Sequence, residues 1–114
     1  LSYPLGTRYK LPHGIANALI FPHVLAANAE VRPEKTARIA SALGFDGGSE
    51  DAVRAGATAF CEALGLDMRL RAHGVTEDSL RAMAEEAHGI RRLLDWNPRD
   101  LSVDEIEAIY RRAF

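Results

Sequence analysis

The chain has 114 residues, a length typical of one domain, with 47% hydrophobic and 26% charged residues and a formal net charge of −2. This balance gives no sign of a surface for nucleic acid or an anionic membrane, and no apolar run is long enough to span a membrane. Cys61 is the only cysteine, which excludes an intrachain disulfide and a cysteine-rich zinc site and fits a reducing, cytoplasmic location.

The N-terminal third contains one loop and one helix. The first dozen residues, LSYPLGTRYKLP, read as a loop that enters a helix. Because the chain opens on Leu1 within such a connection, we expect it to be a fragment of a longer protein. Residues 12–28 predict a helix that is apolar on nearly all sides, and such a helix is buried. Pro22 is expected to kink this helix or end it locally.

Four more helices follow, with no convincing strand. They are predicted from Pro33 to Leu43, from the N-cap Ser49 to a stop at Gly65, from a capping Thr76 to residue 88, and from residue 102 to the C-terminus. Residues 66–75 read as an irregular connector, and Ser102 with Glu105 predicts a capping box. The inner faces are predicted to carry Val53, Ala57, Phe60 and Leu64; Leu80, Met83, Ala84 and Ala87; and Ile106, Ile109, Tyr110 and Ala113. The predicted fold class is all-α.

Two Pro-His pairs, Pro12-His13 and Pro22-His23, raise the question of a metal site. On one continuous helix, a ten-residue offset gives a rise of roughly 15 Å and a rotation of roughly 80°. Because the ligands of one ion lie a few ångströms apart, His13 and His23 cannot share an ion in any simple way. Each histidine must be judged alone.

The two histidines differ in their settings. His13 lies at a loop-to-helix junction, where Pro12 fixes the entry and Gly14 removes a side chain that would block approach to the imidazole. This position favours presentation of the ring to a cleft. For His23 the preferred interpretation is a hydrogen-bonded core or boundary residue.

The stretch SYPLGTRYKLPHGIANALIFPHVLAANAE resembles the iron-containing (group III) alcohol dehydrogenases. The pattern P-L-G followed by P-H-G-x-A-N-A-x-x-x-P-H-V-x-x-x-N is characteristic of their C-terminal domain. LRAHGVTEDSLRAMAEEA and NPRDLSVDEIEAIYRRAF are similar to later segments of that domain, so the resemblance covers almost the whole chain. It implies an all-helical domain over residues 1–114 and an N-terminal α/β domain, absent here, that binds NAD or NADP.

The resemblance also implies a role for particular residues. His13 matches the last histidine of the family's metal site, which holds Fe²⁺ or, in relatives, Zn²⁺; the other ligands would lie before Leu1. Tyr3 stands where many members have a histidine near the substrate. Its hydroxyl could donate a hydrogen bond to substrate, but an acid–base role like that of histidine is not implied. Leu93, Trp96 and Asn97 match a loop that lines the substrate pocket.

Two functions therefore compete. The first is part of an NAD(P)-linked alcohol dehydrogenase that interconverts a small alcohol with an aldehyde or ketone, with a homodimer as a possible assembly. The second is a stand-alone helical interaction module without catalytic activity. The intact P-H-G-x-A-N-A motif favours the enzyme, because a module without metal has little physical need for His13. A nucleic-acid binder is disfavoured by the acidic balance.

Overall fold

The computed structural model describes all 114 residues, which form helices and no strand. The α-helices are α1 (Tyr3–Tyr9), α2 (His13–Asn28), α3 (Pro33–Leu43), α4 (Glu50–Ala63), α5 (Leu80–His88), α6 (Arg91–Leu94) and α7 (Val103–Ala113). Two short 3₁₀ helices, η1 (Leu70–His73) and η2 (Glu77–Ser79), connect α4 to α5. The all-α prediction is confirmed, and no helix is long and apolar enough to cross a membrane.

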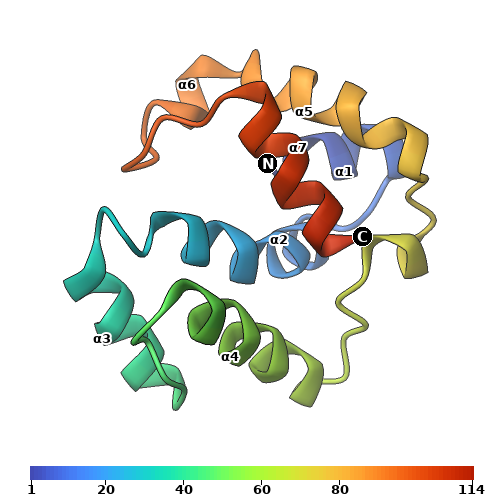
Figure 1. The fold of residues 1–114 in the computed structure, drawn as a ribbon. Coiled ribbons are helices and arrows are strands. Elements are labelled where there is room, and N and C mark those ends of the chain that lie inside the picture. Colours follow the sequence, from blue (N-terminus) through green and yellow to red (C-terminus); the bar gives the residue numbers. More distant parts are fainter.

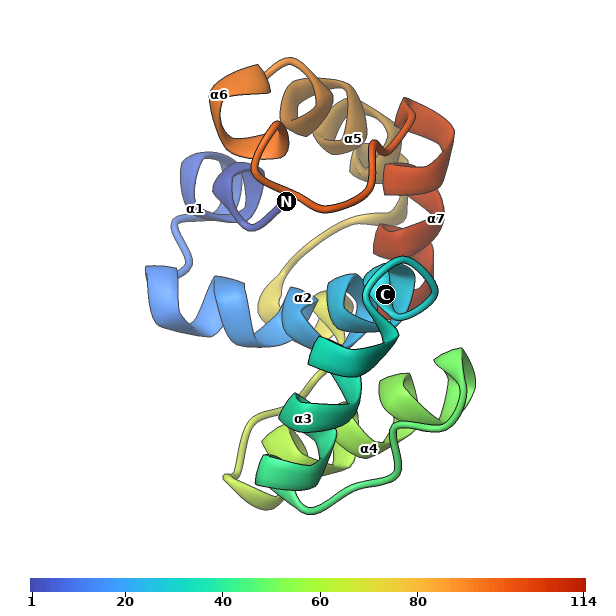
Figure 2. The ribbon, with the colours of Figure 1, turned by 90° about the vertical axis from the view of Figure 1, so that its left-hand side faces the viewer.

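Helix α2 occupies the middle of the molecule. Figures 1 and 2 show α3 and α4 on one side of it and α1, α5 and α6 on the other, and α2 packs against α1, α3, α4 and α7. Its sequence explains this position, since an apolar helix must bury most of its circumference. Leu19 on α2 is fully buried, whereas His13 and Gly14 at its start are exposed. The central helix therefore places one polar end at the surface.

The hydrophobic core is built from the predicted inner faces. The four predicted residues of α5 and the four of α7 are all buried, and together with residues of α1, α2 and the connector they form the main cluster. Ser102 and Glu105 form the predicted capping box, and Ser49 accepts a hydrogen bond from the backbone N–H of Ala52. These caps satisfy backbone donors that each helix start would otherwise leave unpaired.

The prediction of an N-terminal loop is wrong. Residues 3–9 form α1, with Pro4 in its first turn, where the missing N–H of proline costs no hydrogen bond. Leu5 is fully buried, and α1 packs against α2 and α5, so tertiary contacts stabilise a seven-residue helix that is too short to form alone. The helix ends at Lys10, which has a left-handed backbone with φ 55°.

Three smaller predictions are answered by the structure. Of the two effects expected of Pro22, a kink or a local end, the end does not occur, because α2 continues to Asn28, the predicted bound. Leu64 is 75% exposed because α4 ends one residue before it, and Cys61 fills that part of the inner face. Thr76 makes no side-chain cap; its hydroxyl hydrogen-bonds to the Tyr9 hydroxyl at 3.3 Å, and η2 precedes α5.

Candidate functional site

His13 is the first residue of α2, and its side chain is exposed. Pro12 precedes it as N-cap with φ −54° and ψ 141°, an extended conformation that turns the chain into the helix. A Cβ placed on Gly14 would meet no atom within 4 Å apart from its chain neighbours, so the surface at Gly14 is open. The imidazole therefore lies at an exposed helix start.

Tyr3 lies near His13 in the fold. Both residues line a recess of about 200 Å³ between α1 and the start of α2. Tyr3 is 46% exposed and is the first residue of α1, the helix that its buried Leu5 anchors in the core. The structure thus brings the predicted metal ligand and the predicted substrate contact to one opening.

Asn17 is a residue of this site to which sequence reasoning gave no role. Its side-chain nitrogen Nδ2 lies 3.1 Å from Nε2 of His13, one turn earlier on α2. An amide nitrogen only donates, so in this orientation of the Asn17 amide the hydrogen bond is accepted by Nε2. The i to i+4 spacing of the histidine and asparagine in P-H-G-x-A-N was the available signal, since such pairs face each other on a helix.

An apolar groove continues from Asn17 along α2. It has a volume of about 360 Å³, and its lining residues are Leu1, Ser2, Asn17, Ile20, Phe21, Val24, Leu25 and Asn28. A second recess of about 120 Å³, which shares Leu1 and Val24 with the groove, is lined by Tyr3, Leu93 and Asn97 among others. Apolar walls with a few polar side chains are typical of small-molecule sites.

The three predicted pocket residues of the loop after α5 have different settings. Leu93 is 49% exposed at the edge of the second recess. Trp96 is 88% exposed and lines neither the groove nor that recess. Asn97 lines the recess, but its amide exchanges two hydrogen bonds with that of Asn28, at 2.8 and 3.0 Å, and donates another to the Arg99 carbonyl. The structure therefore brings Leu93 and Asn97 together and leaves Trp96 outside.

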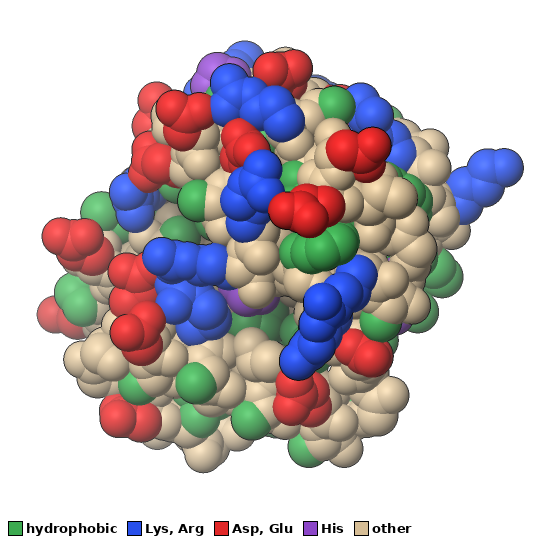
Figure 3. Space-filling view, turned by 45° about the vertical axis from the view of Figure 1, so that its right-hand side comes forward, with side chains coloured by type: hydrophobic (Ala, Val, Ile, Leu, Met, Phe, Trp, Pro, Cys, Tyr) green, Lys and Arg blue, Asp and Glu red, His purple; other side chains and the backbone are tan.

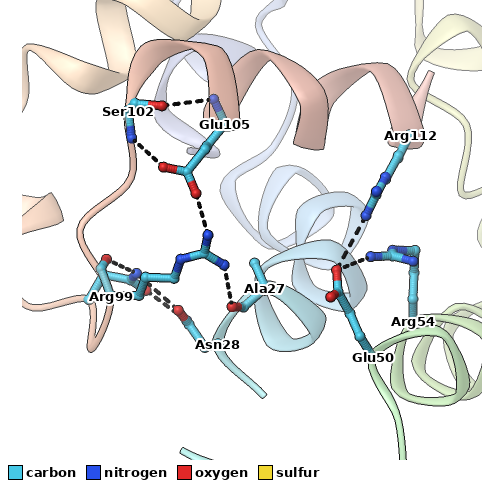
Figure 4. A network of polar contacts seen from close by, with 9 residues as sticks. Ala27, Asn28, Glu50, Arg54, Arg99, Ser102, Glu105 and Arg112 are labelled. Atoms are coloured by element: carbon cyan, nitrogen blue, oxygen red, sulfur yellow. Dashed lines mark hydrogen bonds and ion pairs between the residues drawn. The ribbon is translucent and has the colours of Figure 1, made fainter. Parts of the chain in front are cut away.

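This amide pair belongs to a longer polar network, shown in Figure 4. Arg99 donates to the Ala27 carbonyl at 3.2 Å and pairs with Glu105, the residue that closes the capping box with Ser102. The end of α2, the loop before α7 and the start of α7 are thereby tied together. Asn97 is thus a fixed part of the recess wall.

His23 faces a different region of the molecule. It is 6% exposed and lines a recess between α2, α4 and α7 that also includes Arg54, Arg69 and Arg112. Figure 3 shows a partly covered histidine, in purple, in a hollow beside blue Lys or Arg side chains. Burial, and then the charges of Arg54 and Arg112, lower the pKa of His23 from 6.5 to about 4. His23 is thus buried and neutral, so the expected burial is confirmed, but the expected hydrogen bond is absent: its Nδ1 is buried without a partner.

The donor set for a metal ion is incomplete within this chain. No three histidine, cysteine, aspartate or glutamate side chains lie close enough together to hold an ion. His13 nevertheless fits the part of one ligand, because its side chain is exposed and imidazole is a common metal ligand. A catalytic site with three or four protein ligands would need residues from outside the chain.

Comparison with known proteins decides the family. The model of the Fe-containing alcohol dehydrogenase family, C-terminal, matches residues 1–114. The chain belongs to this family. It is 33% identical to lactaldehyde reductase of Escherichia coli K12 and 36% identical to 1,3-propanediol dehydrogenase of Klebsiella pneumoniae, in both cases over 100% of the chain and 31% of the relative.

Solved structures of the family agree with the fold. The crystal structure of a 1,3-propanediol oxidoreductase superimposes with a TM-score of 0.86 at 36% identity, over 99% of this chain and 31% of that one. A putative alcohol dehydrogenase from Ralstonia eutropha JMP134 gives a TM-score of 0.83 at 31% identity, over 99% and 30%. The chain therefore has the C-terminal fold of the Fe-containing alcohol dehydrogenases and spans just under a third of the length of these relatives.

Proposed function

We propose that the chain is the helical metal-binding domain of an NAD(P)-linked alcohol dehydrogenase, which interconverts a small alcohol with an aldehyde or ketone. The observation that carries this proposal is His13, an exposed imidazole at the start of the central helix that lines one recess with Tyr3 and lies near an apolar groove on the same helix. Membership of the family supports the same reaction class. We further propose a cytoplasmic enzyme, with a homodimer as a possible assembly.

His13 would hold one coordination position of the ion, Fe²⁺ or Zn²⁺, and residues outside the chain would hold the others. When bound, such an ion would lower the pKa of the alcohol hydroxyl. Hydride acceptance belongs to the nicotinamide, which the N-terminal domain outside the chain would bind. His13 serves as a neutral ligand here, because Nε2 must be unprotonated to donate its lone pair.

The other residues of the site bind and orient the substrate. The Tyr3 hydroxyl makes no hydrogen bond within the chain and lines the same recess as His13, so it is free to donate to a substrate oxygen. The apolar side chains of α2 and Leu93 exclude water from the alkyl part of the substrate. Asn97, fixed by Asn28, keeps the wall of the second recess in place. A contact from Trp96 remains a prediction.

The test compares the complete protein that contains this domain with the 114-residue chain alone. The complete protein is assayed with a panel of alcohols, NAD and NADP, alongside elemental analysis. We expect nicotinamide reduction by the complete protein with a divalent metal present, and no turnover, no NAD(P)H binding and only weak metal binding by the chain alone. Turnover by the chain alone would contradict the proposal. A complete protein that reduces neither cofactor with any alcohol would favour the interaction module.

A further inference from the structure

The recess between α2, α4 and α7 has no part in the proposed reaction. It has a volume of about 380 Å³, and its lining residues include Thr58, Met68, His23 and the three arginines Arg54, Arg69 and Arg112. None of its lining residues belongs to the apolar groove or to the recesses around Tyr3. The arginines come from α4, from the connector after it and from α7, so three separate segments meet here.

This recess contains unpaired polar groups. The buried side-chain polar atoms of the chain that make no hydrogen bond are Nδ1 of His23 and Nε of Arg54, and both residues line the recess. His23 is more than nine-tenths buried, and the Arg54 side chain is 17% exposed. Because a buried polar atom without a partner is costly, a bound group that pairs with these nitrogens would be favoured.

The free nitrogen of Arg54 requires an acceptor. Nε of a guanidinium always carries a hydrogen and can only donate. The two terminal nitrogens of Arg54 already donate to Glu50 at 2.7 Å and to Asp51 at 2.9 Å. Figure 4 shows Arg112 of α7 meeting the same Glu50 carboxylate, at 3.3 Å. Arg69 donates a hydrogen bond only from its backbone N–H, so its guanidinium is also open to a ligand with acceptor atoms.

Carboxylates also lie around the recess, but at its rim. Asp51 and Glu62 line it and are exposed, whereas Arg54 is largely covered. The depth of the recess is therefore more positive than its mouth. The lowered pKa of His23 agrees with this, because the charges of Arg54 and Arg112 contribute to the lowering after burial. An anion small enough to pass the carboxylates would make charge-assisted hydrogen bonds inside.

We propose that this recess binds a small oxyanion of the phosphate type, which accepts hydrogen bonds from Nε of Arg54 and from the guanidinium groups of Arg69 and Arg112. The planar fork of arginine suits phosphate oxygens, and the His23 ring supplies a further donor when its proton is on Nδ1. The bound ion would tie α4, the connector and α7 together and stabilise the folded chain. This site goes beyond the proposed function and does not depend on it.

The first experiment titrates inorganic phosphate into the complete protein that contains this domain, at an ionic strength held constant with chloride. NMR of the histidine rings follows binding, and His23→Gln identifies the His23 signals. We expect a saturable shift of these signals, no comparable shift of His88, which does not line the recess, and a higher urea midpoint with phosphate. No saturable His23 shift up to about 20 mM phosphate, well above a millimolar Kd, would overturn the proposal.

The second experiment tests whether the arginines form the site. Arg69→Gln removes one charge from the recess, and Arg71→Gln is the matched control, which removes the same charge from an exposed position outside it. We expect Arg69→Gln to raise the phosphate Kd about fivefold or more, the effect of one charge-assisted hydrogen bond, and Arg71→Gln to change it less than about twofold. Arg54→Lys, which keeps the charge but lacks Nε, should also weaken binding. Equal phosphate affinity in the two glutamine variants would refute the site.

Phenyl phosphate distinguishes two sources of the oxyanion. Binding tighter than that of inorganic phosphate would identify the phosphate group of a larger molecule, and weaker binding would identify the free ion. Either result supports the site if Arg69→Gln weakens it. Binding of both probes that is unchanged in Arg69→Gln would place the phosphate elsewhere and refute the proposal. Alcohol oxidation by the complete protein would remain a separate test of the proposed function, because that reaction does not use this recess.

Discussion

Acidification should destabilise this chain through His23. The pKa of this buried imidazole is lowered from 6.5 to about 4, first by burial and then by Arg54 and Arg112. In the unfolded chain the ring takes up a proton near pH 6.5, whereas the folded chain resists it down to about pH 4. The unfolded state therefore binds more protons between these values, and the free energy of unfolding falls as the pH drops through this window.

The size of the loss in unfolding free energy follows from the pKa shift of His23. The difference between 6.5 and about 4 corresponds to a total of about 3 kcal/mol, of which about 2 kcal/mol is lost between pH 7 and pH 5. His23 lines an open recess, so solvent screening reduces this loss to about 1–2 kcal/mol. Above pH 7 the ring is neutral in both states, and His23 should add almost no pH dependence.

Urea unfolding of the wild type and His23→Gln at pH 7, 6 and 5 measures this contribution. Glutamine is neutral throughout, so the variant should lose about 1–2 kcal/mol less than the wild type between pH 7 and pH 5. An NMR titration of the His23 ring provides an independent value, expected at about 4. Equal losses in the two proteins would refute the reasoning, because His23 would then titrate alike in the folded and unfolded chain.

Two further predictions concern packing. Leu19→Ala should lower the free energy of unfolding by about 2–5 kcal/mol, because Leu19 is fully buried on the central helix; a loss below about 0.5 kcal/mol in urea would place that helix at the periphery. Gly56→Ala should destabilise, because its new Cβ would lie 2.6 Å from the Phe45 side chain, and the overpacking cost of about 1–3 kcal/mol exceeds the helix-propensity gain of about 1 kcal/mol. Gly14→Ala, which meets no atom within 4 Å, is the matched control and should be neutral or slightly stabilising in the same urea assay.

The parts of the fold that were predictable from sequence are those specified by local signals. Helix α3 has the predicted bounds because Pro33 opens it and Gly44, in the left-handed region, ends it. Helix α7 carries its start signal in Ser102 and Glu105. Helix α1 was missed because its proline and glycine resemble turn residues, while the contacts that stabilise it come from α2 and α5.

In the candidate site, too, local features were predictable from sequence and long-range contacts were not. His13 was named as a candidate because a motif and a helix start are both local features of the sequence. The i to i+4 spacing of a helix places Asn17 next to His13, but whether the two side chains touch depends on their conformations. The pairing of Asn97 with Asn28 joins residues 69 positions apart, and no periodic pattern predicts such a contact. Long-range polar contacts therefore had to come from the structure.

The central claim is that His13, and not His23, is the metal ligand. The most direct measurement is the metal-to-protein ratio of the complete enzyme in its wild-type, His13→Ala and His23→Gln forms. Both histidines lie on the continuous helix α2, about three turns apart, so they cannot bind one ion together. His13→Ala should lose the bound metal and keep its helical circular dichroism, since the side chain is exposed. His23→Gln should retain metal at the wild-type ratio. Stoichiometric metal in His13→Ala, together with its loss in His23→Gln, would contradict the account.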